Sequence, residues 1–343
     1  MLFPLTNLAR RATRLLLIAL ILAACRPGDD PPNPYHLTAD IEGNPSIERT
    51  WVEPEIEKVA FLSSGDEYTL YAPNALEIGA DGRLYVFDYG NNRIKAFTRQ
   101  GTYLRTYGEG EGRGPGQMLT MTDLGVWRDS LVYVVDGRQR RVLFFDRSEG
   151  SFLRHERYEQ SVDRFALTSD SAAYSVRDSR GSNFLVMAAP ERRTVVSQIV
   201  SRKMPPIVLD GRLHASRRRA VFVPFYFPVV LTYTPADTTG VAHPTPDYGE
   251  VPMPEARTEQ GGTVTFPPAE NVQAGSSLHE GTLAVQRVNV DSIEFDLYDA
   301  DAMTYRHTVR LPIEQDLAVY GRGRAVVAQD TTVHIYRLER PTK

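Results

Sequence analysis

Cysteine is almost absent from this sequence, because Cys25 is the only one in 343 residues. A single cysteine cannot form a disulfide within the chain, so packing and hydrogen bonds must stabilise the folded protein. The seven histidines are scattered, and none occurs in a His-Glu-x-x-His motif or at a spacing typical of a zinc site. A Gly-x-Ser-x-Gly turn is also absent. The sequence therefore predicts no metal site and carries no signature of a serine hydrolase.

Long hydrophobic runs are absent as well. The most apolar segment, Leu15–Leu22, is much shorter than the roughly 20 residues that cross a bilayer. It follows Arg10, Arg11 and Arg14 and ends at Leu22-Ala23-Ala24-Cys25, so residues 1–24 are predicted to be a signal peptide. The last four residues resemble the bacterial lipobox, which implies cleavage before Cys25 and attachment of lipid to its thiol. The alternative is an ordinary signal peptide in which the cysteine is incidental.

The residues after Cys25 contain little that a folded domain can bury. Arg26–Pro34 is rich in proline, glycine and charge, so residues 25–44 are predicted to form a flexible tether. Arg26 is not the aspartate that, in the lipoproteins this segment resembles, retains the protein at the inner membrane. We therefore expect attachment to the outer membrane, with the folded part facing the periplasm or the cell surface. Asp29-Asp30 resembles a surface-export signal, and the alternative is that the pair only solvates the linker.

Basic residues are fewer than acidic ones, 39 against 43. The formal net charge is −4, and removal of residues 1–24 takes away three arginines and no acid, which leaves −7. Such a surface has no general attraction for nucleic acid or for anionic lipid. We therefore expect a monomer that meets the membrane through its lipid and binds no nucleic acid. Any macromolecular partner is expected to be an envelope protein or a glycan.

Helical periodicity is nearly absent from residues 45–340, which are predicted to form one domain. Short alternating runs rich in Val, Tyr, Phe, Leu and Thr are separated by turn signals, which indicates strands. Asp81-Gly82 is typical of a two-residue hairpin between two such runs. The clearest unit is predicted to contain four antiparallel strands, at 75–79, 83–88, 93–97 and 102–107.

A second unit repeats this plan between residues 124 and 154. Asp88 and Asp136 end the second run of each unit and are 48 residues apart, a spacing typical of propeller blades. Fainter copies of the second strand occur at 172–176, 219–223, 282–286 and 324–328. Six units are therefore predicted.

The sixth unit has only one clear strand after its copy, at 333–337, and so lacks an outer strand. Residues 56–62 are predicted to supply it, which would close the ring and remove exposed sheet edges. The predicted fold class is all-β: a six-bladed β-propeller of four-stranded antiparallel blades, closed by an N-terminal strand.

The first two units carry a recognisable resemblance. Leu84–Asp88, Asn91–Ile94 and Phe97, followed by the glycine-rich Tyr107–Met118, resemble the NHL-type six-bladed propellers of bacterial envelope lipoproteins. The resemblance implies that the glycine-rich segment is an inter-blade loop and that Asp88 and Arg93 form a hydrogen-bonded corner. That segment contains no Gly-Lys-Ser/Thr and precedes no helix, so a phosphate site is not favoured.

Propellers can assemble a site from one residue per blade around a central channel. Calcium-dependent lactonase propellers do so with Glu, Asn and Asp, although their positions do not match this sequence in order. The candidates here are Asn74, Glu77, Asp123 and Asp163. The alternative is that these acidic residues only form turns at strand starts. Calcium is the cofactor of the lactonase hypothesis, and no other cofactor is predicted.

A second group of ligand-binding candidates lies near residues 234–273, which are rich in proline and poor in alternation. This segment is predicted to be an insertion between the fourth and fifth blades, either a recognition loop or a tolerated surface loop. Just before it, Arg217 and Arg218 form a basic spot suited to a carboxylate, a phosphate or an acidic partner. Tyr226 lies in an aromatic turn. The alternatives are a solvated β-turn for the arginines and blade packing for the tyrosine.

Taken together, these patterns favour a noncatalytic, lipid-anchored binding module of the cell envelope rather than an enzyme. A calcium-dependent lactonase or esterase with its site in the channel is the alternative, because one fold hosts many unrelated functions.

Overall fold

The computed structural model describes residues 40–339, apart from 45, 64–67, 129, 170, 178–182, 190–191, 197–209, 217–218, 235–239, 249–254, 260–261, 267–272, 288, 290 and 315–316. The predicted signal peptide, Cys25 and the tether up to residue 39 lie outside the described residues, as do Arg217 and Arg218. Across the described ranges, no helix has the length and apolar character needed to span a bilayer.

Six antiparallel sheets, here named blades 1 to 6 in chain order, make up most of the fold. Blade 1 contains β4 (Pro73–Ile78), β5 (Leu84–Asp88), β6 (Arg93–Phe97) and β7 (Tyr103–Tyr107); blade 2 contains β8 (Met121–Trp127), β9 (Leu131–Asp136), β10 (Arg141–Asp146) and β11 (Phe152–Arg157). Blade 3 contains β12 (Ser161–Leu167), β13 (Ala172–Arg177), β14 (Asn183–Ala189) and β15 (Arg192–Val196); blade 4 contains β16 (Gly211–Ser216), β17 (Arg219–Pro224), β18 (Val229–Tyr233) and β19 (Val241–Pro244). Blade 5 contains β22 (Gln273–His279), β23 (Thr282–Arg287), β24 (Ile293–Asp299) and β25 (Thr304–Leu311); blade 6 contains β26 (Leu317–Gly321), β27 (Arg324–Gln329), β28 (Thr332–Glu339) and β3 (Glu55–Leu62).

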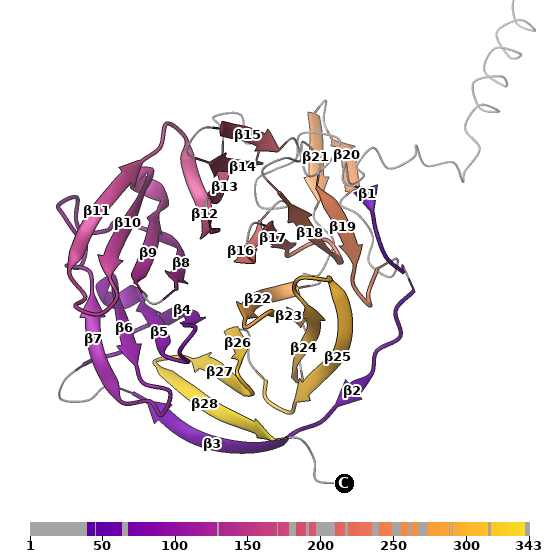
Figure 1. The fold of residues 1–343 in the computed structure, drawn as a ribbon, viewed down its shortest axis with the longest axis horizontal. Coiled ribbons are helices and arrows are strands. Elements are labelled where there is room, and N and C mark those ends of the chain that lie inside the picture. The colour runs from indigo at the N-terminus through magenta and orange to yellow at the C-terminus, as the bar shows by residue number, and fades with distance from the viewer. Residues whose placement is uncertain are drawn as a thin grey trace, which may run out of the picture. The chain divides into compact units, whose positions relative to one another are not determined.

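The blades form a ring with the first strand of each at the centre (Figure 1). Strands β4, β8, β12, β16, β22 and β26 contact one another in that order, and β26 returns to β4. The predicted all-β propeller of four-stranded antiparallel blades is therefore confirmed. Because each blade places its innermost strand at the axis, side chains from all six blades can meet there.

Apolar side chains fill the wedges between neighbouring blades. Tyr85 and Phe87 of blade 1 pack with Val134 and Phe145 of blade 2, and comparable clusters join blades 2 and 3, 4 and 5, 5 and 6, and 6 and 1. These side chains alternate along their strands with residues that face the opposite wedge. The fold is held together by packing between sheets rather than by a single central core, which leaves the axis free.

Two blades share a polar corner at the end of their second strand. The Asp88 carboxylate accepts hydrogen bonds from the amides of Tyr71 and Ala72 and pairs with Lys95. Asp136 occupies the same place in blade 2 and likewise accepts two amide hydrogen bonds from the incoming loop. The expected corner at Asp88 is present, but its charged partner is Lys95 rather than Arg93, because the Arg93 side chain faces solvent while Lys95 is buried. Each corner is followed by a short 3-10 turn, η1 (Tyr89–Asn91) or η2 (Gly137–Gln139).

An N-terminal strap, residues 40–62, runs along the outer edges of blades 4, 5 and 6 in turn (Figure 1). Its first two strands, β1 (Asp40–Ile41) and β2 (Trp51–Val52), pair in parallel with β19 and β25. Its third strand, β3, pairs antiparallel with β28, with Leu62 opposite Val333. The predicted N-terminal closing strand is thus confirmed. The short strands β1 and β2 carry too little alternation to be read from the sequence, and β1 lies inside the segment predicted as tether.

The segment 234–273, predicted to be an insertion between two blades, contains a strand of blade 4 and a separate hairpin. Its first part supplies β19, the outer strand of blade 4, whose sequence Val-Ala-His-Pro has no clear alternation. The later part contains a separate hairpin of β20 (Glu255–Glu259) and β21 (Gly262–Phe266). The additional segment between the two blades therefore begins after Pro244.

The closing strand gives a direct test of ring closure. Leu62 is 2% exposed and packs between blades 6 and 1, whereas its neighbour Phe61 is 53% exposed. We expect Leu62→Ala to lower the free energy of unfolding by about 2–4 kcal/mol, because it removes buried methyl groups at the seam. Phe61→Ala, on the opposite face of the same strand, should cost less than about 1 kcal/mol. Denaturant unfolding of both variants measures this, and equal losses would contradict a seam that depends on Leu62.

Candidate functional site

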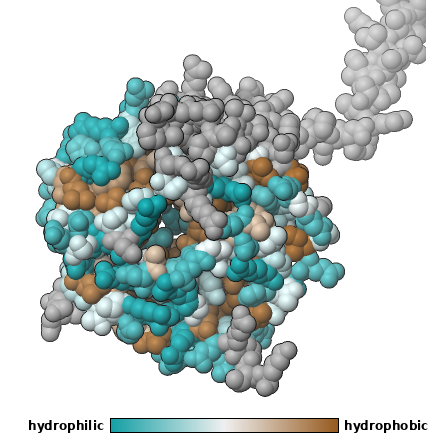
Figure 2. Space-filling model, viewed as in Figure 1, coloured by the Kyte–Doolittle hydropathy of each residue, from teal (hydrophilic) through white to brown (hydrophobic). Residues whose placement is uncertain are grey.

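A cavity of about 320 Å³ lies at the centre of the ring. Every innermost strand contributes to its lining, through residues that include Glu77, Asp123, Ala166, His214, Ser276 and Ala318. Figure 2 shows the centre of one face hollowed, with hydrophilic side chains around the opening. The lining mixes apolar side chains with charged and polar groups, and sites for small molecules combine both kinds. We call this cavity the channel site.

A recurrent β-bulge decides which residues reach the channel site. The pairing register shifts in β4, β8, β12 and β22, and the extra residues are Asn74, Thr122, Asp163 and Ala274. A bulge leaves one residue unpaired and re-aims those that follow. Two predicted candidates, Asn74 and Asp163, are bulge residues and do not line the cavity. Asp123 directly follows a bulge and does line it, as Glu77 does.

Asp123 is the most constrained acid of the channel site. Its side chain belongs to a residue that is 6% exposed, and Oδ2 accepts a hydrogen bond of 2.9 Å from the amide of Phe165. Oδ1 lies 3.7 Å from Nη1 of Arg212. Burial raises the pKa of Asp123, against the opposing effect of Arg164 and Arg212. This carboxylate already has protein partners on both oxygens.

Two arginines at the channel differ sharply in their contacts. Arg164 donates to the carbonyls of Thr122 and Gly211 and pairs with Asp210 at 2.8 Å, so its guanidinium ties blades 2, 3 and 4 together. Arg212 lines the cavity and has no hydrogen bond within the described part of the chain. Burial and the neighbouring Arg164 lower the pKa of Arg212. Arg164 is therefore structural, and Arg212 holds donors that a ligand can use.

Glu77 faces Arg212 from the other side of the ring. The two residues come from blades 1 and 4, which are opposite one another in a ring of six. Burial, together with the nearby negative charge of Asp123, raises the pKa of Glu77 to about 8. Its carboxyl is therefore largely protonated at neutral pH and can donate one hydrogen bond.

A histidine and a serine complete the polar lining. Nε2 of His214 lies 2.8 Å from the hydroxyl oxygen of Ser276. Burial and the charge of Arg212 lower the pKa of His214 to about 3, so its imidazole is neutral at ordinary pH. Such a histidine contributes a hydrogen bond but is a weak base.

The aromatic candidate lies elsewhere. Tyr226 is in the turn between β17 and β18, half-buried, and it does not line the channel site. That turn is fixed to the neighbouring strands, since the amide of Phe225 donates to the carbonyl of Asp210 and its carbonyl accepts from the amide of Gln273. Arg217 and Arg218 lie outside the described residues.

Sequence reasoning missed Arg212, His214 and Ser276. All three are on innermost strands of blades 4 and 5, where the repeat is faint. Their positions could have been inferred from the repeat, because an innermost strand must precede each copy of the second strand. Strand β16 ends three residues before β17, so Arg212 and His214 were within reach of that rule.

A larger hollow of about 790 Å³ borders the strap and is lined by Trp51, His279, Arg306 and Tyr320, among others. Two of its polar side chains contact other parts of the protein. Nε2 of His279 lies 2.8 Å from the carbonyl of Gly79, and Arg306 pairs with Asp299 at 2.7 Å. This hollow is lined by the strap and by blades 5 and 6, whereas every blade contributes to the channel site.

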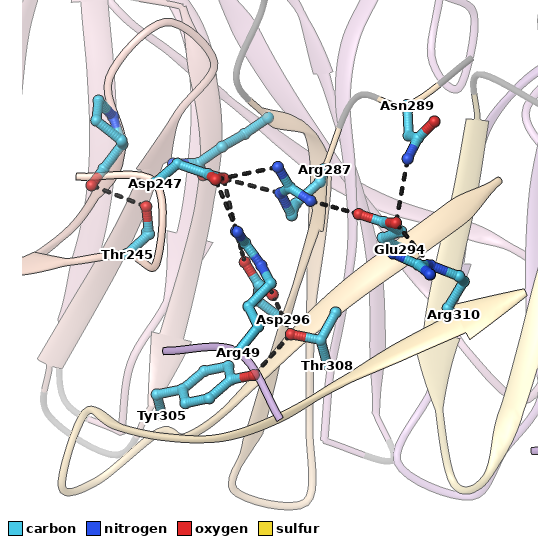
Figure 3. A network of polar contacts seen from close by, with 12 residues as sticks. Arg49, Thr245, Asp247, Arg287, Asn289, Glu294, Asp296, Tyr305, Thr308 and Arg310 are labelled. Carbon is cyan, nitrogen blue, oxygen red and sulfur yellow. Dashed lines mark hydrogen bonds and ion pairs between the residues drawn. The ribbon is translucent and has the colours of Figure 1, made fainter. Parts of the chain in front are cut away.

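The densest charge cluster of the described residues, here named the strap lock, binds Arg49 of the strap to the blades beneath it (Figure 3). Arg49 donates to both oxygens of Asp247, at 2.8 and 2.6 Å, and to Asp296 of β24 at 3.2 and 3.0 Å. Arg287 joins Asp247 to Glu294, which also accepts from Arg310. Although burial opposes the charged form, the hydrogen bonds from Arg49 and Arg287 lower the pKa of Asp247. The charges of this cluster neutralise one another, so we assign it to stability rather than to ligand binding.

Comparisons with known proteins agree with the architecture. Residues 59–228 match a family model described as a 6-bladed beta-propeller. A solved structure from Bacteroides fragilis has a TM-score of 0.54 at 12% identity, covering 88% of this chain and 99% of that chain. The chain is a β-propeller.

The propeller is also similar to two solved lyases. Streptogramin B lyase gives a TM-score of 0.52 at 11% identity over 83% of this chain and 98% of its own. Virginiamycin B lyase from Staphylococcus aureus gives 0.50 at 10% identity over 83% of this chain and 100% of its own. At these identities the likeness concerns the fold alone. No curated protein sequence is significantly similar to this one.

The unusual titration of Glu77 has a consequence for stability. Its pKa rises from an ordinary value of 4.5 to about 8 on folding, so between these values the folded protein holds a proton that the unfolded chain has lost. Stability must then fall as the pH rises through this window. We expect Glu77→Gln to melt at a higher temperature than the wild type at pH 9 and to lose that advantage at pH 4.

Thermal unfolding at both pH values measures this difference. Glu156→Gln, which changes an exposed carboxylate, is the matched control and should show no such dependence. A Glu77→Gln advantage of equal size at both pH values would contradict the raised pKa.

Proposed function

We propose that this protein is a lipid-anchored binding module of the bacterial cell envelope, which holds a small molecule in the channel site without transforming it. One observation carries the proposal: Glu77 and Arg212 line the same cavity from opposite blades, and neither side chain has a hydrogen bond within the described residues. Polar side chains that reach a cavity without a hydrogen-bond partner are available to a ligand. Two such groups around a cavity of about 320 Å³ with a mixed polar and apolar lining support a small-molecule site.

A hydrolase is the second candidate, and the contact between His214 and Ser276 is the observation in its favour. A serine beside a histidine is the start of a nucleophile and base pair. The lowered pKa of His214, about 3, makes that base a poor acceptor for the serine proton. The binding module therefore fits the electrostatics of the channel site better.

The calcium-dependent version of the hydrolase meets a further obstacle. Glu77 and Asp123 are the two carboxylates of the channel site, and no group of three or more His, Cys, Asp or Glu side chains with metal-binding geometry occurs in the described ranges. Arg212, at 3.7 Å from Asp123, would repel a divalent cation there. Calcium also prefers six to eight oxygen ligands. The donors present suit an organic ligand better than a metal ion.

The envelope location rests on the N-terminal sequence. The cationic residues, the short apolar run and the lipobox-like Leu22-Ala23-Ala24-Cys25 support export and lipid attachment, and Arg26 supports the outer membrane. Lipid chains would supply the membrane affinity that the acidic surface lacks. We propose a monomeric receptor on a tether.

A thermal-shift screen of the full-length protein in detergent, against a library of small polar metabolites, tests ligand binding. Compounds that bind the channel site should raise the melting temperature, because they bind only the folded state. Ser169 is exposed and lines the cavity, so Ser169→Trp should obstruct it and weaken binding at least tenfold. Ser148→Trp, at an exposed turn outside the lining, is the control. Absence of any stabilising compound, or equal binding by both variants, would refute a channel ligand.

Lipid attachment has its own test. The wild-type chain should partition into the membrane fraction and into the detergent phase on phase separation. Cys25→Ser should move to the soluble fraction, since the thiol that carries the lipid is gone. Membrane retention of Cys25→Ser would contradict a lipid anchor at this residue.

A further inference from the structure

The charges of the channel site narrow the class of ligand. Its lining contains two arginines, Arg128 and Arg212, and two acids, Glu77 and Asp123. Asp123 is already engaged by the Phe165 amide and by Arg212, and Glu77 is largely neutral. Arg128 is exposed and stacks on Trp127, with its guanidinium carbon 4.5 Å from the ring centroid. Arg212 is thus the interior charge whose hydrogen-bonding capacity is unused.

Arg212 lacks a close, hydrogen-bonded negative charge, which a bound anion would supply. Burial disfavours its charge, and Arg164 from the next blade adds repulsion. Its contact with Asp123 at 3.7 Å is longer than a charged hydrogen bond. A planar guanidinium offers a fork of donors that matches the two oxygens of a carboxylate. A bound carboxylate would satisfy these donors and offset both penalties.

Glu77, on the blade opposite Arg212, places a second requirement on the ligand. A carboxylate on the axis, with one oxygen bound to Arg212 of blade 4, can present its second oxygen to Glu77 of blade 1. A protonated Glu77 can donate a hydrogen bond there, whereas an ionised Glu77 would repel the anion. The remaining walls are uncharged: β12 contributes Ala166 and Leu167, and β26 contributes Leu317, Ala318 and Val319.

We infer that the channel site binds a small monocarboxylate with a short apolar body, its carboxylate held between Arg212 and Glu77. This assignment rests on the proposed function and names its ligand class. The cavity of about 320 Å³ admits only a small molecule. Its apolar side chains, such as Leu167 and Val319, accept a hydrocarbon body, and Arg212, the arginine that lies inside the cavity rather than at its exposed mouth, binds one anionic group.

Calorimetric titration of the full-length protein with pentanoate, benzoate and phenylacetate tests the assignment. The primary amides of the same acids are the matched ligands, because they keep the shape and lose the charge. We expect at least one acid to bind at least tenfold more tightly than its amide. Arg212→Met should weaken that acid at least tenfold, and Arg212→Lys should restore part of the loss.

Arg128→Met is the matched protein control. It removes the same charge from the same cavity, but at the exposed mouth, and should change the affinity less than twofold. Equal losses from Arg128→Met and Arg212→Met would mean general electrostatic attraction and would overturn the assignment. Melting curves of each variant establish that it is folded.

The pH dependence of binding gives a second readout. The charged and titratable groups near Glu77 are Arg128 and Asp123 of blade 2, Arg212 and His214 of β16, and Tyr133 of β9, whose pKa burial raises far above its usual range. His214, with a pKa of about 3, stays neutral between pH 7 and pH 9. The residues that β22 and β26 contribute to the lining are uncharged. Affinity for the acid should therefore fall at least fivefold between pH 7 and pH 9 as Glu77 ionises, and Glu77→Gln should bind equally at both.

The outcomes separate the two proposals. If the metabolite screen yields channel ligands that are uncharged or cationic, and Arg212→Met binds them as well as the wild type does, the carboxylate assignment is wrong while the binding module stands. If no compound of any class stabilises the protein, the proposed function fails and the assignment fails with it.

Discussion

Pairing of β3 with β28 is the contact on which the rest of the structure depends. Each innermost strand is held at the axis only because its blade is wedged between two neighbours, and the wedge between blades 6 and 1 exists only when the ring is closed. Residues from the N-terminal strap supply the outer strand of the last blade, so one antiparallel ladder joins the two ends of the described chain. With one cysteine in the sequence, no disulfide substitutes for this ladder. Closure, and with it the geometry of the channel site, is a matter of hydrogen bonds and apolar packing.

Polar groups are arranged in two contrasting ways in this propeller. At the strap lock, Arg49, Asp247 and Asp296 satisfy one another, and such a cluster stabilises a specific arrangement of segments. At the channel site, the side chains of Arg212 and Glu77 line the cavity and have no hydrogen bond to another described residue. Burying charged or polar groups without partners is costly. The same chain thus saturates its charges with hydrogen bonds at the strap lock, whereas the channel site keeps Arg212 in a single long contact with Asp123.

Much of the fold was predictable, and the limits have a physical cause. The second strand of each blade is buried on both faces, so its apolar run stands out, as at Arg219–Pro224 and Arg324–Gln329. Innermost strands of later blades are interrupted by channel residues such as Arg164, Arg212 and Ser276, which destroy the alternation that marks a strand. Asp123 was found because blade 2 has a clear repeat, whereas Arg212 was not because blade 4 has a faint one. Asn74 and Asp163 were plausible by residue type, but a bulge, which no pattern revealed, turns them away from the cavity.

The strap also fixes the order of events during synthesis. Glu55–Leu62 is made early, yet its partner Thr332–Glu339 is made last, with more than 250 residues between them. Contacts of such sequence separation form slowly, and an unpaired strand is prone to the wrong pairing while it waits. The charged residues of this strand, Glu55, Glu57 and Lys58, oppose such pairing. A nascent chain must therefore remain open until its final blade arrives, and the ring closes in one late step.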